Sequence, residues 1–301
     1  MNQGARNLLF RRFLFVLLLI TTYSANAQDL KVYISADMEG IAGVVSLDQL
    51  GPKGFEYRQF RKFMTAEVNA AIKAARDAGA TEIVVSDSHG NGLNLLLDAL
   101  PQDIELVRSW PRPLGMMEGI DDTFSAAIFI GYHASAGNTD GILAHTMSGA
   151  DFSSIKINGI EITEGGFNAL IAGHFGVPVV MISGDEAAVR EVSDMLGPIE
   201  GAVVKWHSSH TSGRTLMPKA AQALIKEKVK AGLRRRQELK PFLIEGPLTL
   251  DLMYKNSNAA ELIAYLPNVE LIDNHTVRIV GSIIELSMFI EMALGYPTTM
   301  K

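Results

Sequence analysis

The sequence predicts an α/β fold in which a mostly parallel central sheet is flanked by helices and followed by a smaller C-terminal α+β portion. Short apolar runs of strand length alternate with longer stretches whose apolar residues recur at helical spacing, which is typical of βαβ units. This alternation becomes less regular from about residue 205. Hydrophobic residues make up 48% of the chain, enough for a sizeable core. We therefore expect one domain over residues 28–301, with its less regular part from about 205.

The expected elements follow one another along the chain. Residues 30–36 form the first expected strand, and residues 64–78 form a helix that Gly79 ends. Asn158-Gly159 lies between two apolar runs and is typical of a β-hairpin turn. The other expected strands are 82–86, 126–130 (closed by Gly131), 154–157, 160–162 and 177–183, and the other expected helices are 165–175 and 186–196. The smaller portion is expected to include residues 242–253 and 269–280.

The first 27 residues have the three parts of a secretory signal peptide. A basic start with three arginines is followed by an apolar run at 13–20 and by Ala25-Asn26-Ala27, which has the form of a signal peptidase site. The apolar run is shorter than the ~20 residues that a membrane-spanning helix needs, so cleavage is favoured over anchoring. We expect an exported protein, periplasmic or secreted, with no stable membrane insertion after cleavage.

Charge and cysteine content exclude several classes of function. The net charge is −6, and loss of the signal segment with its three arginines takes it to −9. An acidic chain argues against nucleic acid or an anionic membrane as a partner, but not against a short peptide. No cysteine is present. Thiolate catalysis and Cys-ligated zinc are therefore excluded, and any metal must be bound by His, Asp and Glu.

Polar residues interrupt the apolar runs at the ends of three expected strands. Asp37 and Glu39 follow the first of these strands, His89 follows the second and His133 follows the third. Parallel strands bring their carboxyl ends to one edge of the sheet, so these side chains should lie close together. Two carboxylates that point the same way repel each other unless protons or a cation lie between them. Nitrogen and oxygen ligands suit a catalytic zinc site, and several carboxylates with two imidazoles can hold two metals.

Each of these residues also has an ordinary structural explanation, and their spacing alone does not decide between the two. An Asp-x-Glu pair can be part of a solvated loop, and a histidine after a strand is often only hydrogen-bonded within its loop. Glu164 begins an expected helix, where an acid stabilises the helix dipole, or it is a further metal ligand.

Other polar residues receive structural interpretations. Asp185 is expected to cap the helix that follows it, and Asp87 and Asp185 are candidates for orienting the imidazoles. His207 and His210 lie in an expected loop and are interpreted as surface residues. The basic stretch 226–240 is interpreted as a solvated helix face.

Six motifs occur in one order along the chain. They are Asp37-Met38-Glu39-Gly40-Ile41-Ala42-Gly43, Asp87-Ser88-His89, Glu118-Gly119-Ile120-Asp121-Asp122-Thr123-Phe124, Gly131-Tyr132-His133-Ala134, His145-Thr146-Met147-Ser148 and Glu164-Gly165-Gly166-Phe167-Asn168-Ala169. Together they resemble the bacterial D-aminopeptidases of the dipeptide-transport-operon type. The resemblance covers nearly all of the chain after the signal segment, and is looser after about residue 205.

The resemblance implies a metallo-aminopeptidase with two zinc ions per subunit. The positions that match the family's metal ligands are Asp37, Glu39, His89, His133 and Glu164, with Asp37 as the bridge. His145 matches the family's catalytic residue, and its role stays open between nucleophile and general acid or base. The resemblance further implies short peptide substrates with an N-terminal D-amino acid such as D-Ala, and a ring-like homo-oligomer, a decamer.

Two other functions remain open at this point. An exported metallohydrolase for L-peptides, or for other amides or esters, could use the same ligands, because chirality is selected by pocket walls that the sequence does not identify. A non-enzymatic exported binding protein would explain the signal segment and the α/β pattern. It would not explain so many ligand-type residues at strand ends.

Overall fold

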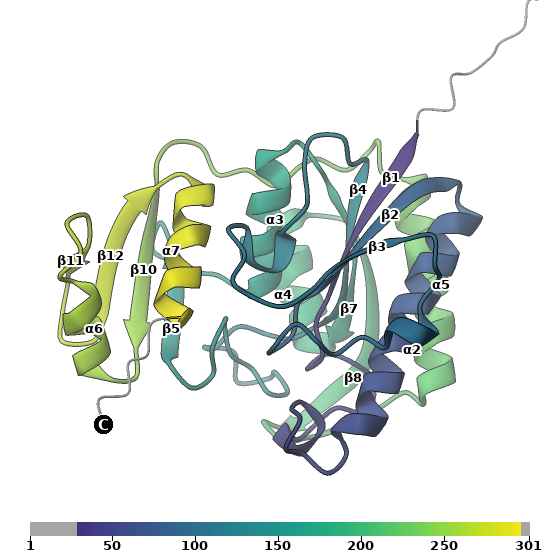
Figure 1. Ribbon diagram of the computed structural model, residues 1–301, viewed down its shortest axis with the longest axis horizontal. Helices are drawn as coiled ribbons and strands as arrows, with labels where there is room; N and C mark the ends of the chain where they lie inside the picture. The colour runs from purple at the N-terminus through teal and green to yellow at the C-terminus, as the bar shows by residue number, and fades with distance from the viewer. Residues whose placement is uncertain (1–28, 296–301) are drawn as a thin grey trace, which may run out of the picture.

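The protein is described by a computed structural model that covers residues 29–295, so the signal segment expected at 1–27 lies outside the described residues. Two sheets form the molecule: a seven-stranded sheet of order β3-β2-β1-β4-β7-β8-β9 and a five-stranded sheet of order β11-β12-β10-β5-β6. Figure 1 shows the larger sheet with helices on both sides and the smaller sheet beside it. The predicted fold class is confirmed. No helix within residues 29–295 has the length and apolar character that a membrane span requires.

The larger sheet is parallel except at one edge. Its strands are β1 (Leu30–Ala36), β2 (Ala80–Asp87), β3 (Glu105–Val107), β4 (Ala126–Tyr132), β7 (Val179–Asp185), β8 (Glu200–Ser209) and β9 (Ser212–Thr215), and only β9 is antiparallel to its neighbour. Helices α2 (Tyr57–Asp77) and α5 (Pro218–Arg234) cover one face, and α3 (Glu164–His174) and α4 (Glu186–Leu196) cover the other. Residues of β1 alternate between two hydrophobic cores, with Val32 in one and Tyr33 in the other. Burial on both faces explains why these strands are almost continuously apolar.

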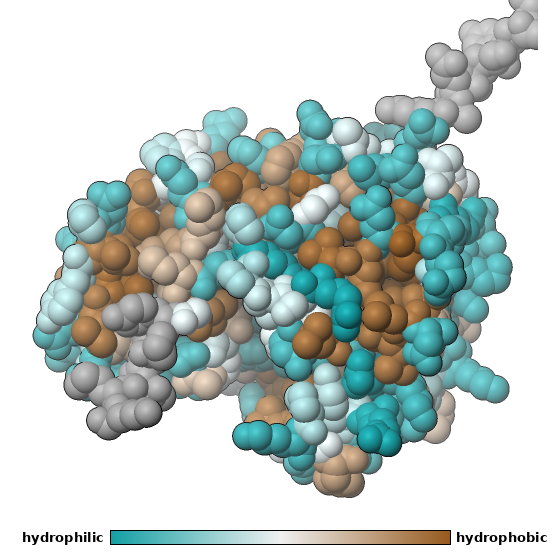
Figure 2. All heavy atoms as spheres, in the orientation of Figure 1, coloured by the Kyte–Doolittle hydropathy of each residue, from teal (hydrophilic) through white to brown (hydrophobic). Residues whose placement is uncertain are grey.

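The smaller sheet is antiparallel and draws on two distant parts of the chain. Its strands are β5 (Phe152–Ile157), β6 (Ile160–Glu161), β10 (Leu248–Tyr254), β11 (Glu270–Leu271) and β12 (Thr276–Gly281), with α6 (Ser257–Ile263) and α7 (Ile283–Gly295) beside them. The predicted hairpin is confirmed, because Asn158 and Gly159 have φ values of 52° and 81° between β5 and β6. Apolar residues stay exposed on β11 and β12, where Figure 2 shows a hydrophobic patch at the left of the molecule.

Some predicted boundaries were wrong. Helix α2 begins at Tyr57 rather than at residue 64, and its N-cap Glu56 makes no side-chain capping bond that could mark the start. Strand β4 continues through Gly131, which has a φ of 74°, to Tyr132. Residues 207–210 were expected to lie in a loop, but residues 200–215 form the β8–β9 hairpin of the larger sheet.

The larger sheet and its helices extend to the end of α5, and the chain returns to the smaller sheet at β10. Strands β10 and β12 overlap residues 242–253 and 269–280, which were expected in the smaller portion. The β5–β6 hairpin pairs with β10, so the smaller part is not purely C-terminal. Within the described residues, short 3-10 turns follow three of the strands: η1 (Leu47–Gln49) after β1, η2 (Leu97–Ala99) after β2 and η3 (Gly115–Met117) after β3.

Candidate metal centre

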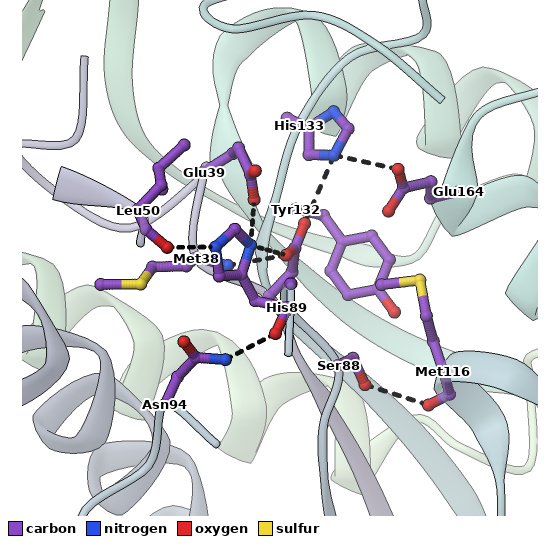
Figure 3. A network of polar contacts seen from close by, with 12 residues as sticks. Met38, Glu39, Leu50, Ser88, His89, Asn94, Met116, Tyr132, His133 and Glu164 are labelled. Atoms are coloured by element: carbon purple, nitrogen blue, oxygen red, sulfur yellow. Dashed lines mark hydrogen bonds and ion pairs between the residues drawn. The ribbon is translucent and has the colours of Figure 1, made fainter. Parts of the chain in front are cut away.

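Four segments meet at the carboxyl edge of the larger sheet. Asp37 and Glu39 follow β1, His89 follows β2, His133 follows β4 and Glu164 begins α3. Each of these five side chains is buried, with at most 7% of the residue exposed. The structure therefore brings together all five residues expected as metal ligands, and Figure 3 shows the two imidazoles on either side of a central carboxylate.

Asp37 lies at the centre of the cluster because its two oxygens face different imidazoles. Its Oδ1 is 3.2 Å from His89 Nδ1, and its Oδ2 is 3.4 Å from His133 Nε2. Glu39 Oε2 is 2.8 Å from the same His89 nitrogen, and Glu164 Oε1 is 3.2 Å from the same His133 nitrogen. The cluster thus has two halves that share Asp37, and this is an arrangement that suits two neighbouring cations.

A glycine allows the loop after β1 to approach the end of β4. The Gly40 N–H donates to Gly131 O at 2.7 Å. A Cβ at Gly40 would lie 2.0 Å from Tyr132 O, so a side chain at this position would push the two segments apart. This close approach places Asp37 beside His133.

Backbone carbonyls fix the orientation of the three imidazoles at the site. His89 Nε2 lies 2.8 Å from Leu50 O, His133 Nδ1 lies 3.0 Å from Ala134 O, and His145 Nδ1 lies 2.8 Å from Leu143 O. A carbonyl oxygen can only accept, so each of these nitrogens carries the hydrogen. Asp87 and Asp185, which were expected as candidates for this task, were the wrong residues.

Asp87 and Asp185 bind backbone N–H groups instead. Asp87 accepts from the backbone of Asn94 at 2.6 Å and of Leu95 at 2.7 Å. Asp185 accepts from Ala188 N at 2.8 Å, which is the predicted helix cap, and from Ile142 N at 2.8 Å. Both aspartates therefore hold loops around the site.

The tautomers make the cluster a suitable site for a cation. When His89 and His133 are neutral, each turns a lone pair toward carboxylate oxygens only 2.8 to 3.4 Å away. Such contacts are repulsive unless a proton or a metal lies between the atoms. Within residues 29–295, Asp37 Oδ2, Glu39 Oε2 and His133 Nε2 are buried and have no hydrogen-bond partner. Two sets of ligand atoms lie within 4.8 Å of one another: Asp37, Glu39 and His133, and His133, His145 and Glu164. The donors are nitrogen and oxygen, which fit zinc.

Burial and mutual charge set the protonation of the cluster. Burial, with the neighbouring carboxylate of Glu39, raises the pKa of Asp37 to about 8. Burial disfavours charge on His133 as well, but the carboxylates of Glu164 and Asp37 outweigh it and raise its pKa to about 10. His89 follows the same pattern: burial opposes its charge, yet Glu39 raises its pKa well above the ordinary value. The carboxylates therefore attract positive charge into the centre, and a divalent cation supplies the same compensation.

His145 lies at the edge of the cluster, in the loop between β4 and β5. Its ring stacks on His133 with a centroid distance of 4.0 Å and an interplanar angle of 7°. Its Nε2 is 4.0 Å from Glu39 Oε1 and 3.8 Å from Glu164 Oε1, and its side chain is 20% exposed. Burial and the charge of His133 lower the pKa of His145. It is therefore a neutral imidazole whose Nε2 lone pair faces the centre.

A cavity of about 690 Å³ opens over the cluster. This volume lies in the range of sites for small ligands. The lining includes Asp37, Glu39, His89, His145 and Glu164. It also includes residues that were not expected as ligands, such as Trp110, Met147, Asp151 and Glu291. Trp110 donates from its indole N–H to Gly90 O at 2.7 Å, which fixes this part of the lining beside His89.

The remaining sequence candidates lie outside the cavity lining. His207 belongs to β8 and His210 to the turn after it, so both are on the β8–β9 hairpin. The backbone of that turn supports the site, because Leu143 N donates to His210 O at 2.8 Å. In the basic stretch, Lys228 and Arg235 form ion pairs with Glu200 at 3.1 and 2.8 Å.

Comparison with known proteins shows which family this chain resembles. The family model described as peptidase M55, D-aminopeptidase, matches residues 30–291. A D-aminopeptidase of Bacillus subtilis (strain 168) is 34% identical to the chain over 242 residues, which cover 80% of this chain and 88% of that protein. The solved structure "Zn-dependent D-aminopeptidase DppA from Bacillus subtilis, a self-compartmentalizing protease" has a TM-score of 0.84 to this one at 31% identity, over 89% of this chain and 99% of the other.

Proposed function

We propose that this chain, which belongs to the D-aminopeptidase family, binds two zinc ions per subunit at the buried cluster and removes N-terminal D-amino acids such as D-Ala from short peptides. The chain is a metallo-aminopeptidase by its family. The observation that carries the proposal is the set of buried ligand atoms without hydrogen-bond partners in the described residues, Asp37 Oδ2, Glu39 Oε2 and His133 Nε2.

The proposed ligands divide into two groups around a shared carboxylate. Glu39 and His89 would hold one ion and His133 and Glu164 the other, and Asp37 would serve both groups, since each of its oxygens faces a different imidazole. When bound, zinc supplies Lewis-acid polarisation of the scissile carbonyl and lowers the pKa of water to about 7. The carbonyls of Leu50 and Ala134 keep the two ligand imidazoles in the tautomers that binding requires.

His145 is proposed to move a proton at its Nε2 atom. Its Nδ1–H is engaged by Leu143 O, so Nε2 is the free acceptor and faces the space between Glu39 and Glu164. A lowered pKa keeps that acceptor available at neutral pH. We propose general base and then general acid catalysis, because both steps use this one atom and need no covalent adduct.

The cavity supports a short substrate with a free N-terminal amine. Its lining contains Asp151 and Glu291 in addition to the cluster, and it contains no lysine or arginine among the described residues. An acidic cavity of about 690 Å³ attracts an ammonium group and limits the length of peptide that fits. The proposed preference for D-residues is supported by the family and by the names of the two B. subtilis proteins.

We further propose that residues 1–27 are removed on export to the periplasm or the medium, and that the remaining domain assembles into a ring-like homo-oligomer, a decamer. The assembly proposal is supported by the similar B. subtilis structure, which is described as a self-compartmentalizing protease. N-terminal sequencing of protein purified from the cell envelope fraction tests the first part. Light scattering of the mature protein tests the second.

One experiment tests the central proposal. The purified protein is analysed for metal and assayed on D-Ala-D-Ala and L-Ala-L-Ala, and on the matching D- and L-alanine amides, before and after treatment with a chelator. We expect bound zinc, turnover of the D-substrates, loss of turnover with the chelator and recovery on zinc addition. Preferential turnover of the L-substrates would establish the alternative metallohydrolase. A folded protein that binds no zinc and stays inactive contradicts the proposal as a whole.

A further inference from the structure

A second group of buried charges lies next to the candidate metal centre. Lys205, on β8, is fully buried and is among the largest side chains of the interior. Its ammonium donates to Glu39 O and, at 2.6 Å, to Val44 O. No carboxylate within residues 29–295 lies at ion-pair distance from it, so these two carbonyls are its partners. A buried ammonium is costly unless such bonds compensate its lost hydration.

Both carbonyls belong to the loop after β1, which carries Asp37 and Glu39. Side chains of other elements also accept hydrogen bonds from two N–H groups of this loop, residues 37–44. Ala42 N donates to Glu67 Oε1 of α2 at 3.0 Å, and Gly43 N donates to Thr215 Oγ1 of β9 at 2.8 Å. Glu67 is itself fully buried. The loop therefore depends on side chains from three distant elements.

We infer that Lys205 is a positioning residue for the metal centre: it fixes the backbone of Glu39 and thereby the direction of the Asp37 and Glu39 carboxylates. This inference rests on the proposed function. Metal ligands bind well only when their direction is set by the groups behind them. Burial lowers the pKa of Lys205 to about 8, against the attraction of nearby carboxylates that include Asp185, Glu39, Glu67 and Asp37. The ammonium, still charged at neutral pH, therefore also offsets part of the repulsion between Glu39 and Asp37.

A purely structural role for Lys205, as a filler between β8 and the loop, predicts a different result. It would reduce the amount of folded protein without changing the zinc affinity of what remains. A positioning role predicts that zinc binds more weakly to protein that is folded. The two are separated by measuring zinc affinity and unfolding on the same samples.

The experiment compares the full mature chain with Lys205→Met, which keeps the length of the side chain and removes its charge and donors. The control is Lys228→Met, which removes a lysine of α5 that pairs with Glu200 at 3.1 Å, outside the site. Zinc affinity is measured by competition with a chromophoric chelator, and activity on D-Ala-D-Ala is followed as zinc is titrated back. We expect Lys205→Met to weaken zinc binding about 10- to 100-fold and to shift the midpoint of the titration by the same factor. Lys228→Met should match the wild type.

The outcomes are separable. Wild-type protein that binds no zinc contradicts the proposed function. Wild-type protein that binds zinc, with unchanged affinity in folded Lys205→Met, overturns only the positioning role. If Lys205→Met does not fold, Lys205→Gln, which keeps a neutral donor, and Thr215→Val, which releases Gly43 N from the same loop, take its place. If the replacement variants that fold bind zinc as tightly as the wild type, the inference is overturned.

Discussion

Three aspartates lie at the carboxyl ends of parallel strands of the larger sheet, and they differ in their hydrogen bonds. Asp37, Asp87 and Asp185 follow or end β1, β2 and β7, and none is more than 2% exposed. Asp87 and Asp185 each use both oxygens to accept hydrogen bonds. Asp37 accepts from Met38 N through Oδ1, but its Oδ2 has no hydrogen-bond partner in the part of the chain that the structure describes.

The difference separates structural carboxylates from functional ones. A buried carboxylate surrounded by N–H donors compensates its own charge and holds the loops that provide the donors. A buried carboxylate that faces imidazole lone pairs and another carboxylate needs a cation. Position at a strand end makes the three aspartates look alike, whereas the supply of donors distinguishes them. The following changes test that distinction, from the largest expected effect to the smallest.

Replacing Asp37 by Asn should have the largest effect on function. The substitution removes the proposed bridge, and a bound metal contributes several kcal/mol to transition-state stabilisation, so kcat/KM should fall by about 1,000-fold or more. Bound zinc, measured by elemental analysis, should fall with it. Asp185→Asn is the control, because both oxygens of Asp185 already accept hydrogen bonds, and this variant should retain its zinc. Equal zinc loss in both variants would show that Asp37 and Asp185 do not differ in their importance for metal binding.

His145→Ala should reduce turnover by about 100- to 10,000-fold, the range for loss of a general acid–base group. Its zinc content should stay at the wild-type value, since it is proposed to move protons rather than to hold the metal. Steady-state kinetics and metal analysis on the same preparation check this. Loss of zinc together with activity would instead make His145 a ligand, which its place among His133 and Glu164 also allows.

Removal of zinc should destabilise the wild type, because a ligand that binds only the folded state stabilises it. With free zinc at 1,000 times its Kd, the expected loss on adding a chelator is about 4 kcal/mol in the free energy of unfolding. Asp37→Asn should show no such response. Urea unfolding with and without chelator measures both, and a chelator effect of the same size in the variant would contradict the assignment of Asp37.

Asp185→Ala should cost about 2–4 kcal/mol of stability in metal-free protein, through loss of the α4 cap and of the partner of Ile142 N. Asp37→Asn, under the same conditions, should be neutral or stabilising, since Asn cannot take the charged form that burial and Glu39 disfavour at this position. Chemical unfolding of the two variants beside the wild type gives the comparison directly. A larger loss of stability for Asp37→Asn than for Asp185→Ala would contradict this prediction.

The smallest expected effect is at Glu67, which is buried although only one of its oxygens accepts a hydrogen bond. Burial raises the pKa of Glu67 to about 8 from its ordinary 4.5. Between these values the folded chain keeps a proton that the unfolded chain has lost, so this contribution to stability declines as pH rises. Between pH 5.5 and 7 the decline should reach at most about 2 kcal/mol.

The comparison for this test is Glu67→Gln, which has no proton to lose. Its free energy of unfolding should change less than that of the wild type over the same pH range. The measurement is urea unfolding at a series of pH values. Parallel pH profiles for the two proteins would show that Glu67 titrates as an exposed acid does.

Part of the fold and of the site could be predicted because the signals are local. The apolar run of β1 ends at Asp37, and the cap of α4 follows from Asp185 alone. The alternation of strands and helices then places the ends of β1, β2 and β4 at one edge. His145 did not stand out by spacing and was found only through the family resemblance, because it lies in the middle of the long loop after β4 rather than directly at a strand end.

Other features of the fold and the site could not be predicted, because no local sequence signal marks them. Helix α2 starts without a side-chain cap, so its first two turns gave no signal. The β8–β9 hairpin is partly exposed and polar, and resembles a loop. The imidazoles are oriented by carbonyls of Leu50, Ala134 and Leu143, and every residue has a carbonyl, so no side chain in the sequence marks that task.

The sequence by itself determined which side chains reach the carboxyl edge of the sheet, because strand boundaries and ligand types are local properties. Only the tertiary structure decided which of those side chains are already satisfied. The donors that satisfy Asp185 include Ile142 N, 43 residues away, and the ammonium that holds Glu39 O belongs to Lys205, 166 residues away. Hydrogen-bond satisfaction depends on such distant neighbours, and for that reason Asp37 and Asp185 differ in the folded chain although they occupy similar places in the sequence.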